Sequence, residues 1–240
     1  MRALAPIVIR SGWRAVRVIP PEHCERPATI GMVADRGAPD AALVRRAVAV
    51  CRDLGVCAAI TQALRPPDQP PFLAAGGRVI QELDLLHLSN PVPRRWWSAG
   101  GDVSVQRHSP DRSIADLDYL AFGPFWHFDT VALRDALVAT QSSRLRAISL
   151  GEQPIGYLIS GTSQTRGFIQ RLAVHPDHEG RGYASAMLAD ALGWMGRAGV
   201  DSVSINTQGD NERARLLYER HGFVRQAEQL TVIDFDLSSP

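Results

Sequence analysis

The sequence predicts an α/β fold (an α+β arrangement) in which helices flank a mixed central sheet with parallel strands in its middle. Apolar residues recur at helical spacing over residues 181–197, and strand-like runs flank this segment at residues 167–174 and 203–206. A second helical pattern follows at residues 212–221. A strand, a helix and a second strand in this order favour a right-handed crossover, which makes the two strands parallel.

The segments on either side of this unit complete the predicted sheet. Residues 114–140 read as helical, with a break at Gly123 and Pro124, because glycine and proline both interrupt helices. Further strands are expected at residues 145–150, 156–160 and 223–237.

A stretch rich in Pro, Trp and Gly, residues 90–101, predicts a boundary between two parts of the chain. Its prolines lack amide donors and disfavour helix before them, so neither a sheet nor a helix should run through. We therefore expect two domains, residues 1–97 and residues 98–240. Trp96 and Trp97 are expected to pack where the two parts meet.

The first half of the chain repeats the order of elements in the second. A predicted helix at residues 41–54 is followed by Gly55 and a strand at residues 58–63, as the later helix is followed by Gly199 and a strand. The two glycines are 144 residues apart (199 − 55). We interpret this as an internal duplication whose first copy has lost the chemistry that the second keeps.

Composition excludes several classes of function. The formal net charge is +1 and the pI about 7.8, so no overall field attracts the chain to nucleic acid or to anionic membranes. No apolar run approaches the roughly 18–20 residues of a membrane span. Cys24, Cys51 and Cys57 form no C-x-x-C pair, which favours a reduced, cytoplasmic chain without a metal site.

The segment QRLAVHPDHEGRGYASA, residues 170–186, carries the main functional signal. A strand ends at Val174, and Gly180-Arg181-Gly182 opens the next helix, whose first amides have no intrahelical partner. This arrangement either binds a phosphate or pyrophosphate or is a simple glycine turn. A P-loop is excluded because the chain has no lysine, and a dinucleotide fingerprint fails because Ser185 stands where it needs Gly or Ala.

A second motif, NERARLLYERHGF, follows at residues 211–223. Asn211 is suited to cap the N-terminus of a helix, and Gly222 is suited to end it in the left-handed conformation. Ala214 and Tyr218 share one helical face with Asn211. Taken alone, Tyr218 is either a core residue of an amphipathic helix or a functional phenol.

Together, RLAVHP-x-x-x-GRGYA and N-x-x-A-x-x-L-Y-E-x-x-GF resemble the GNAT superfamily of acyl-CoA-dependent N-acyltransferases, over residues 145–237. The resemblance implies a GNAT fold for residues 98–240 and acetyl-CoA as co-substrate. The family pattern Q/R-x-x-G-x-G/A falls on Glu179, Gly182 and Ala184, of which Glu179 does not conform. A carboxylate there would repel a pyrophosphate unless it points to solvent or pairs with an arginine such as Arg181.

The resemblance assigns roles residue by residue. Tyr218 would be the general acid that protonates the departing coenzyme A thiolate, since a phenol is protonated at neutral pH. Asn211 would contact the pantetheine side of the cofactor. Backbone groups would bind the pantetheine arm and the pyrophosphate, at Leu172, Ala173, Val174, Gly180, Arg181, Gly182, Tyr183, Ala184 and Ser185.

A general base is not evident in the sequence. Position 206, where related N-terminal-amine acetyltransferases carry glutamate, is Asn206, and Phe168 on the preceding strand is not acidic either. Other candidates lie in the variable, substrate-facing region: Asp116, Asp118, His127 and Asp129. Each of these is otherwise read as a solvated surface residue. Aromatic residues of the same region either wall an acceptor pocket or pack on the sheet: Tyr119, Phe122, Phe125, Trp126 and Phe128.

The predicted activity is N-acetyl transfer from acetyl-CoA to a primary amine of a small molecule or peptide by direct attack. The alternative is a non-catalytic acyl-CoA-binding regulatory module. Residues 1–97 resemble the degenerate repeat of tandem acetyltransferases such as the mycothiol synthase type. Their counterpart of the phosphate turn, residues 36–40, lacks G-x-G, and Leu73 or Ala74 replaces Tyr218, so no productive acetyl-CoA site is expected there.

Overall fold

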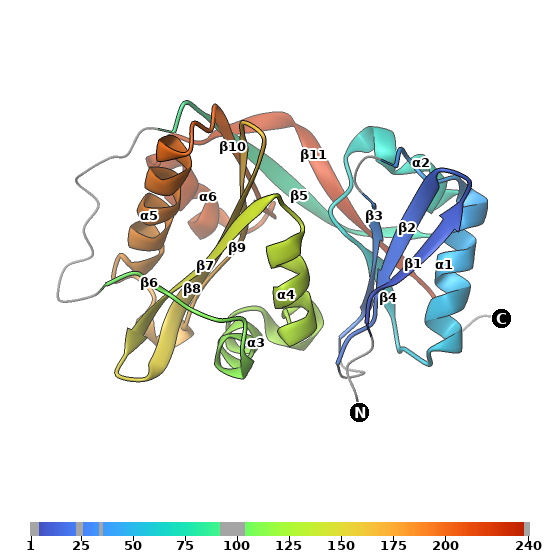
Figure 1. The fold of residues 1–240 in the computed structure, drawn as a ribbon, viewed down its shortest axis with the longest axis horizontal. Coiled ribbons are helices and arrows are strands. Elements are labelled where there is room, and N and C mark those ends of the chain that lie inside the picture. The colour runs from blue at the N-terminus through green and yellow to red at the C-terminus, as the bar shows by residue number, and fades with distance from the viewer. Residues whose placement is uncertain (1–4, 23–25, 34–35, 92–103, 238–240) are drawn as a thin grey trace. The chain divides into compact units, whose positions relative to one another are not determined.

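The computed structural model describes the chain except for residues 1–4, 23–25, 34–35, 92–103 and 238–240 (Figure 1). It contains two compact units, each discontinuous in sequence. Unit 1 comprises Met1–Leu85, Asn206–Asn211 and Gln226–Pro240, and unit 2 comprises Leu86–Ile205 and Glu212–Arg225.

The units are discontinuous because β5 (Arg78–Ser89), β10 (Ser202–Gln208) and β11 (Val224–Phe235) each have residues in both of them. The boundary predicted between residues 97 and 98 lies outside the described residues, so the division into domains 1–97 and 98–240 stays a prediction. Trp96 and Trp97, predicted to pack at the boundary, lie outside the described residues.

Unit 1 combines a sheet with one long helix. Its sheet order is β1-β2-β3-β4-β11-β5, with β3 and β4 parallel and the pairs β1/β2, β2/β3 and β4/β11 antiparallel. Its elements are β1 (Ile7–Ser11), β2 (Arg14–Ile19), β3 (Ala28–Met32), α1 (Ala41–Asp53), β4 (Ala59–Thr61), η1 (Pro66–Asp68), α2 (Pro70–Leu73), β5 (Arg78–Ser89) and β11 (Val224–Phe235).

Helix α1 buries one face against this sheet. Its buried positions, Leu43, Val44, Ala47, Val48 and Cys51, recur at helical spacing and join the unit's apolar core. The core also includes residues of β2, β3, β4 and β11.

Unit 2 holds the first sequence motif, residues 170–186, and residues 212–223 of the second, whose first residue Asn211 belongs to unit 1. Its sheet order is β5-β10-β9-β8-β7-β6. Its elements are β6 (Gln106–Arg107), α3 (Arg112–Trp126), α4 (Thr130–Val138), β7 (Ser142–Leu150), β8 (Gln153–Ser163), β9 (Arg166–Val174), η2 (Pro176–His178), α5 (Tyr183–Arg197), β10 (Ser202–Gln208) and α6 (Glu212–Arg220), together with parts of β5 and β11.

The two faces of the unit 2 sheet are covered by different helices. One face packs on α5 and α6 through a core that includes Leu158, Met187, Leu188 and Val203. The other packs on α3 and α4 through a core that includes Leu117, Leu133 and Tyr157. The face under α5 and α6 therefore positions Tyr218, and the face under α3 and α4 positions Asp118 and Arg171.

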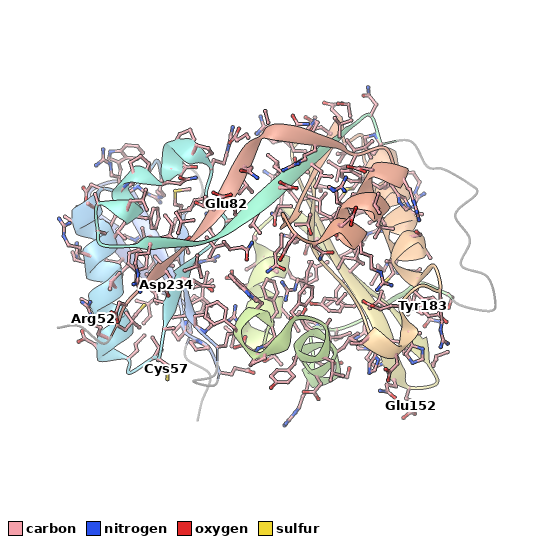
Figure 2. All side chains as sticks on the ribbon, turned by 180° about the vertical axis from the view of Figure 1, so that it is seen from behind. Arg52, Cys57, Glu82, Glu152, Tyr183 and Asp234 are labelled. Carbon is pink, nitrogen blue, oxygen red and sulfur yellow. The ribbon has the colours of Figure 1, made fainter. Side chains whose placement is uncertain are left out.

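The helical and strand segments predicted for this unit are present, with shifted ends. The predicted helix at residues 181–197 begins at Tyr183, which is labelled in Figure 2. The predicted helix at residues 114–140 divides where expected, because Gly123 has a φ of 74° and precedes Pro124, and the chain resumes a helix at Thr130.

Each unit contains a strand–helix–strand crossover with parallel strands. In unit 1 it is β3–α1–β4, and in unit 2 it is β9–α5–β10. Gly55 and Gly199, the glycines aligned by the sequence offset, both adopt a left-handed backbone, with φ of 67° and 72°. This agreement supports the proposed duplication, which stays a prediction.

The expectation of a chain without disulfides is wrong. Cys57 is disulfide-bonded, whereas Cys51 is a free thiol in the core of unit 1. Burial raises the pKa of the Cys51 thiol to about 11. Cys24 lies outside the described residues. The cysteines of this chain form no C-x-x-C pair or other recognised spacing, so no sign of this bond is visible in the sequence. Among the described residues, no helix combines the length and apolar character needed to cross a membrane.

We predict that Asp40→Ala lowers the free energy of unfolding, because it removes the N-terminal cap of α1. The Asp40 carboxylate accepts a hydrogen bond of 2.8 Å from the Leu43 amide. Asp40→Asn, which keeps an acceptor oxygen, should lose less. Urea denaturation compares the two variants, and equal losses would contradict a capping role.

Candidate functional site

The turn between β9 and α5 leaves the N-terminus of α5 open. Gly180 and Gly182 have φ of 76° and 84°, a conformation that residues with a Cβ rarely adopt. Gly182 is the N-cap residue, and no side chain among the described residues caps the first amides of α5. These amides and the positive end of the helix dipole therefore point at a place where an anion can bind.

The equivalent helix of unit 1 differs at this point. The N-terminus of α1 is occupied by the chain's own Asp40 carboxylate, and the hydrogen bond from the Leu43 amide lowers the pKa of Asp40. An anion is thus built into the N-terminus of α1, whereas Gly182, the N-cap residue of α5, has no side chain that could act in this way.

Glu179, the residue that departs from the family pattern, is neutralised by a partner other than the one expected. It forms an ion pair with Arg213 of α6. Arg181, the expected partner, instead donates from Nη2 to the Asp177 carbonyl oxygen at 3.3 Å. Pairing with Arg213 reduces the repulsion that a bare carboxylate would exert on an anion at the turn.

Strand β9 presents free backbone just before the turn. It pairs in parallel with β10 only at its start, where Phe168 is opposite Ser204. Beyond that point its described partner is β8, with Leu158 opposite Leu172 and Tyr157 opposite Ala173. One edge of β9, up to Val174, can therefore hydrogen-bond an extended ligand.

A β-bulge sets which side chains of β9 face which layer. The pairing register with β8 shifts between Ile159 and Ser160, and Gln170 on β9 is the residue without a partner. After the bulge, Leu172 packs on the core under α5, whereas Arg171 and Ala173 face α3.

Tyr218 lies in the core of unit 2 and is almost fully buried. Its ring contacts the Phe223 ring, with centroids 6.0 Å apart. Its hydroxyl makes no hydrogen bond within the described part of the chain. Burial raises the pKa of the Tyr218 phenol above its usual value, and the positive charge of Arg171 opposes this shift. Tyr218 is therefore a protonated donor at neutral pH.

Asn211 immediately precedes α6, as predicted from its capping character. Its backbone amide donates to the Gln208 carbonyl oxygen at 3.0 Å. The helix that it precedes ends at Arg220, and Gly222 follows with a φ of 91°, as the sequence predicted.

Comparison with known proteins identifies the domain that carries this turn. The family model described as Acetyltransferase (GNAT) family matches residues 112–223. These residues form a GNAT acetyltransferase domain.

Curated relatives match over shorter segments. A mycothiol acetyltransferase of Beutenbergia cavernae is 44% identical over 57 residues, which is 24% of this chain and 19% of that protein. The N-alpha-acetyltransferase 30 of Schizosaccharomyces pombe is 37% identical over 60 residues, 25% of this chain and 40% of that protein. The matched segments thus span about a fifth to two fifths of the length of these relatives.

A solved structure extends the likeness of the fold to most of the chain. A tandem GNAT protein from the clavulanic acid biosynthesis pathway has a TM-score of 0.64 and 14% identity, and the match covers 96% of this chain and 82% of that one. At 14% sequence identity, this structural similarity shows that the two proteins share a fold and does not show a shared function.

A buried ion pair, missed in the sequence, fixes the α3 side of the GNAT domain. Asp118 accepts two hydrogen bonds of 2.8 Å from Arg171, one from Nε and one from Nη2. Asp118 also accepts from the Tyr157 hydroxyl and the Phe128 amide, each at 2.5 Å. Both carboxylate oxygens of Asp118 are therefore fully used as acceptors.

Arg171 ties the substrate-facing segment to β9. Its guanidinium also donates from Nη2 to the Trp126 carbonyl oxygen at 2.7 Å. Its Cζ lies 3.5 Å from the centroid of the Phe122 ring and 4.1 Å from that of Phe128. Two of the five predicted pocket aromatics thus pack against an arginine, and the segment between α3 and α4 is anchored to the strand beside the open edge.

The structure corrects the expectation that the candidate bases are solvated surface residues. Asp118 is wholly buried and saturated with donors, and the buried Asp129 caps α4 through the Ala132 amide at 2.8 Å. Asp116 is exposed near Arg112, as expected. His127 Nδ1 lies 2.7 Å from the Pro124 carbonyl oxygen. Asp118 and Asp129 therefore have structural roles.

Sequence reasoning could not find the ion pair, because a single Arg in a strand and a single Asp in a helix carry no shared pattern. Their pairing depends on the β-bulge at Gln170, which turns Arg171 toward α3. Within the described ranges, no group of three or more His, Cys, Asp or Glu side chains is placed to hold a metal ion.

We predict that Asp118→Asn lowers the free energy of unfolding by about 3–5 kcal/mol, because it leaves the Arg171 charge buried without its partner. Asp116→Asn, two residues away on the exposed side of α3, is the matched control and should change stability by less than about 0.5 kcal/mol. Urea denaturation measures both. Similar losses in the two variants would show that the buried pair does not stabilise the domain.

Proposed function

We propose that the chain is an acetyl-CoA-dependent N-acetyltransferase that acetylates a primary amine of a small molecule or peptide. The observation that carries this proposal is the open N-terminus of α5 within a GNAT domain, directly after a β9 edge that has no strand partner among the described residues. Relatives named as a mycothiol acetyltransferase and an N-alpha-acetyltransferase support an amine acceptor without choosing its class.

The residues of the turn fit a diphosphate. Amides from Gly180 to Ser185 would donate to its oxygens, and no capping side chain competes for them. Backbone groups of Leu172, Ala173 and Val174 would hydrogen-bond the pantetheine arm along the free edge of β9. Asn211 is proposed to contact the same arm.

The proposed reaction is a direct attack without a covalent enzyme intermediate. The neutral amine forms a bond to the thioester carbonyl carbon, and the carbon–sulfur bond breaks. Tyr218 donates its proton to the departing thiolate and regains one from solvent. Asp118 has no free oxygen to receive the proton that the amine releases, so this proton passes to another base or to a water chain.

The segment that Arg171 anchors is the proposed acceptor wall. Tyr119 is 40% exposed there and stacks edge-on against His127, with ring centroids 5.2 Å apart. Phe122 and Phe128 are held by Arg171, so they give this wall a fixed shape.

For unit 1 we propose that no productive acetyl-CoA site exists. Its crossover helix already carries the Asp40 carboxylate at the N-terminus, which occupies the Leu43 amide that a diphosphate would need. This proposal agrees with the expected loss of chemistry from the first copy.

A second candidate function is a non-catalytic acyl-CoA-binding module. Two observations favour it, because each removes a candidate general base. Positions 168 and 206 carry neutral residues, and the carboxylate of Asp118 is hydrogen-bonded to Arg171. A module that only binds the cofactor has no use for a phenol at Tyr218, so catalysis by that residue separates the two functions.

We predict that Tyr218→Phe lowers kcat by about 10²–10⁴-fold, because the leaving thiolate loses its proton donor. The dissociation constant for acetyl-CoA should barely change, since the ring stays in the core. Thiol release with a panel of amines and calorimetric titration with acetyl-CoA measure the two quantities.

Leu216→Ala, on the more exposed side of the same helix α6, is the control and should retain full activity. If Tyr218→Phe keeps full activity with an accepted amine, Tyr218 is not the general acid. If no amine in the panel is acetylated while acetyl-CoA binds, the binding module is the better description.

We predict that Gly182→Ala weakens coenzyme A binding by roughly tenfold or more, because a Cβ disfavours the left-handed conformation that exposes the amides. Gly151→Ala, at a left-handed position with open space in the turn between β7 and β8, is the matched control. Calorimetry on both variants checks this. Equal binding by the two would contradict a role for the turn in holding the diphosphate.

A further inference from the structure

An open pocket of about 470 Å³ lies at the sheet edge formed by β6 and β7, apart from the turn before α5. No residue of that turn lines it, and β8 separates β7 from β9 in the sheet. Its polar lining consists of Arg107, His108, Ser109, Ser143, Arg144 and Arg146.

The sheet register gathers arginines on one face of this edge. Arg107 of β6 stands directly opposite Arg146 of β7. Arg144 is two residues from Arg146 in the same strand, so both side chains point to the same face. Like charges directly opposite each other destabilise a strand pair. The fold therefore carries an electrostatic cost at this edge.

One described carboxylate offsets part of this charge. Asp190 of α5 lies 3.4 Å from Arg146 Nε, measured to Oδ2. The contact lacks hydrogen-bond geometry, so both atoms are buried without a hydrogen bond among the described residues. Asp190 thus offsets part of the charge of three arginines, and a second carboxylate, Asp111, lies 3.7 Å from Nδ1 of the lining residue His108.

Arg144 is held in place by an aromatic ring and not by an acid. Its Cζ lies 4.4 Å from the centroid of the Trp194 ring. Stacking occupies a flat face of the guanidinium and leaves its N–H edges available. Burial and the nearby charges of Arg146, Arg197 and Arg107 lower the pKa of Arg144, and Asp190 opposes them. The excess of positive charge is thus concentrated around Arg144.

We propose that this pocket binds a small molecule that carries at least two negative charges on phosphate or carboxylate oxygens. The arginine forks match the geometry of either group, and the Ser109 hydroxyl adds a donor at the wall. The pocket volume lies within the range of small-molecule sites and exceeds the volume of a single phosphate ion. We therefore infer that the ligand is a larger molecule that carries the anionic groups.

Trp194 provides a direct reporter for the test. Inorganic pyrophosphate and citrate, titrated separately into the full chain, should change the fluorescence of Trp194 and bind in calorimetry. Trp194→Phe should abolish the fluorescence change while calorimetric binding remains. Both titrations contain coenzyme A at a fixed concentration, so that it occupies the turn before α5. The variants described below show whether the anion binds in the pocket, and they do so even if coenzyme A does not bind.

Arg144→Gln should weaken binding of the anion by about tenfold or more, because it removes one charge-assisted pair of hydrogen bonds. Arg166→Gln, an exposed arginine at the start of β9 outside the pocket, is the matched control and should bind as the unmodified chain does.

Arg107→Gln gives a test that does not depend on a buried side chain. Arg107 is exposed, so the variant should fold. It should raise the melting temperature without ligand, since it relieves repulsion with Arg146, and it should weaken anion binding. A purely structural role for the arginines cannot produce both effects.

The two probes distinguish the sources of the anion. Binding of pyrophosphate alone assigns a phosphate ligand, and binding of citrate alone assigns a polycarboxylate. The proposal is overturned if neither binds more tightly than about 10 mM. It is also overturned if Arg144→Gln and Arg107→Gln both bind as the unmodified chain does.

Discussion

The proposed chemistry depends on the open N-terminus of α5. A helix normally satisfies its first amides with a capping side chain, as α1 does with Asp40. Gly182 supplies no such group, and its left-handed backbone turns the amides outward just after β9 loses its partner strand. Leaving these donors without a cap costs stability, and an anionic ligand would satisfy them.

The α3 side of the domain is fixed by the opposite strategy, in which the buried carboxylate of Asp118 receives a full set of hydrogen bonds. Asp118 and Arg171 are buried together, and four hydrogen bonds reach the carboxylate from three residues. Such a pair is costly to bury but costly to break as well, which makes it suited to hold one geometry. It connects the segment around Trp126 to the strand that would carry the thioester.

The sequence predicted what depends on local pattern. The crossover, the break at Gly123 and the turn at Gly180 follow from periodicity and from glycine and proline chemistry, and the structure contains them. The roles of the charged residues were not predictable in this way. Whether Asp118 is exposed or buried depends on the bulge at Gln170 and on a contact across 53 residues, neither of which has a local signature.

The most direct test of the central claim is a crystal structure of the full chain with acetyl-CoA. We predict that the diphosphate oxygens accept hydrogen bonds from amides between Gly180 and Ser185, with the thioester along β9 and its sulfur next to the Tyr218 hydroxyl. A complex in which the diphosphate binds elsewhere, or in which Tyr218 points away from the sulfur, would contradict both the site and the reaction.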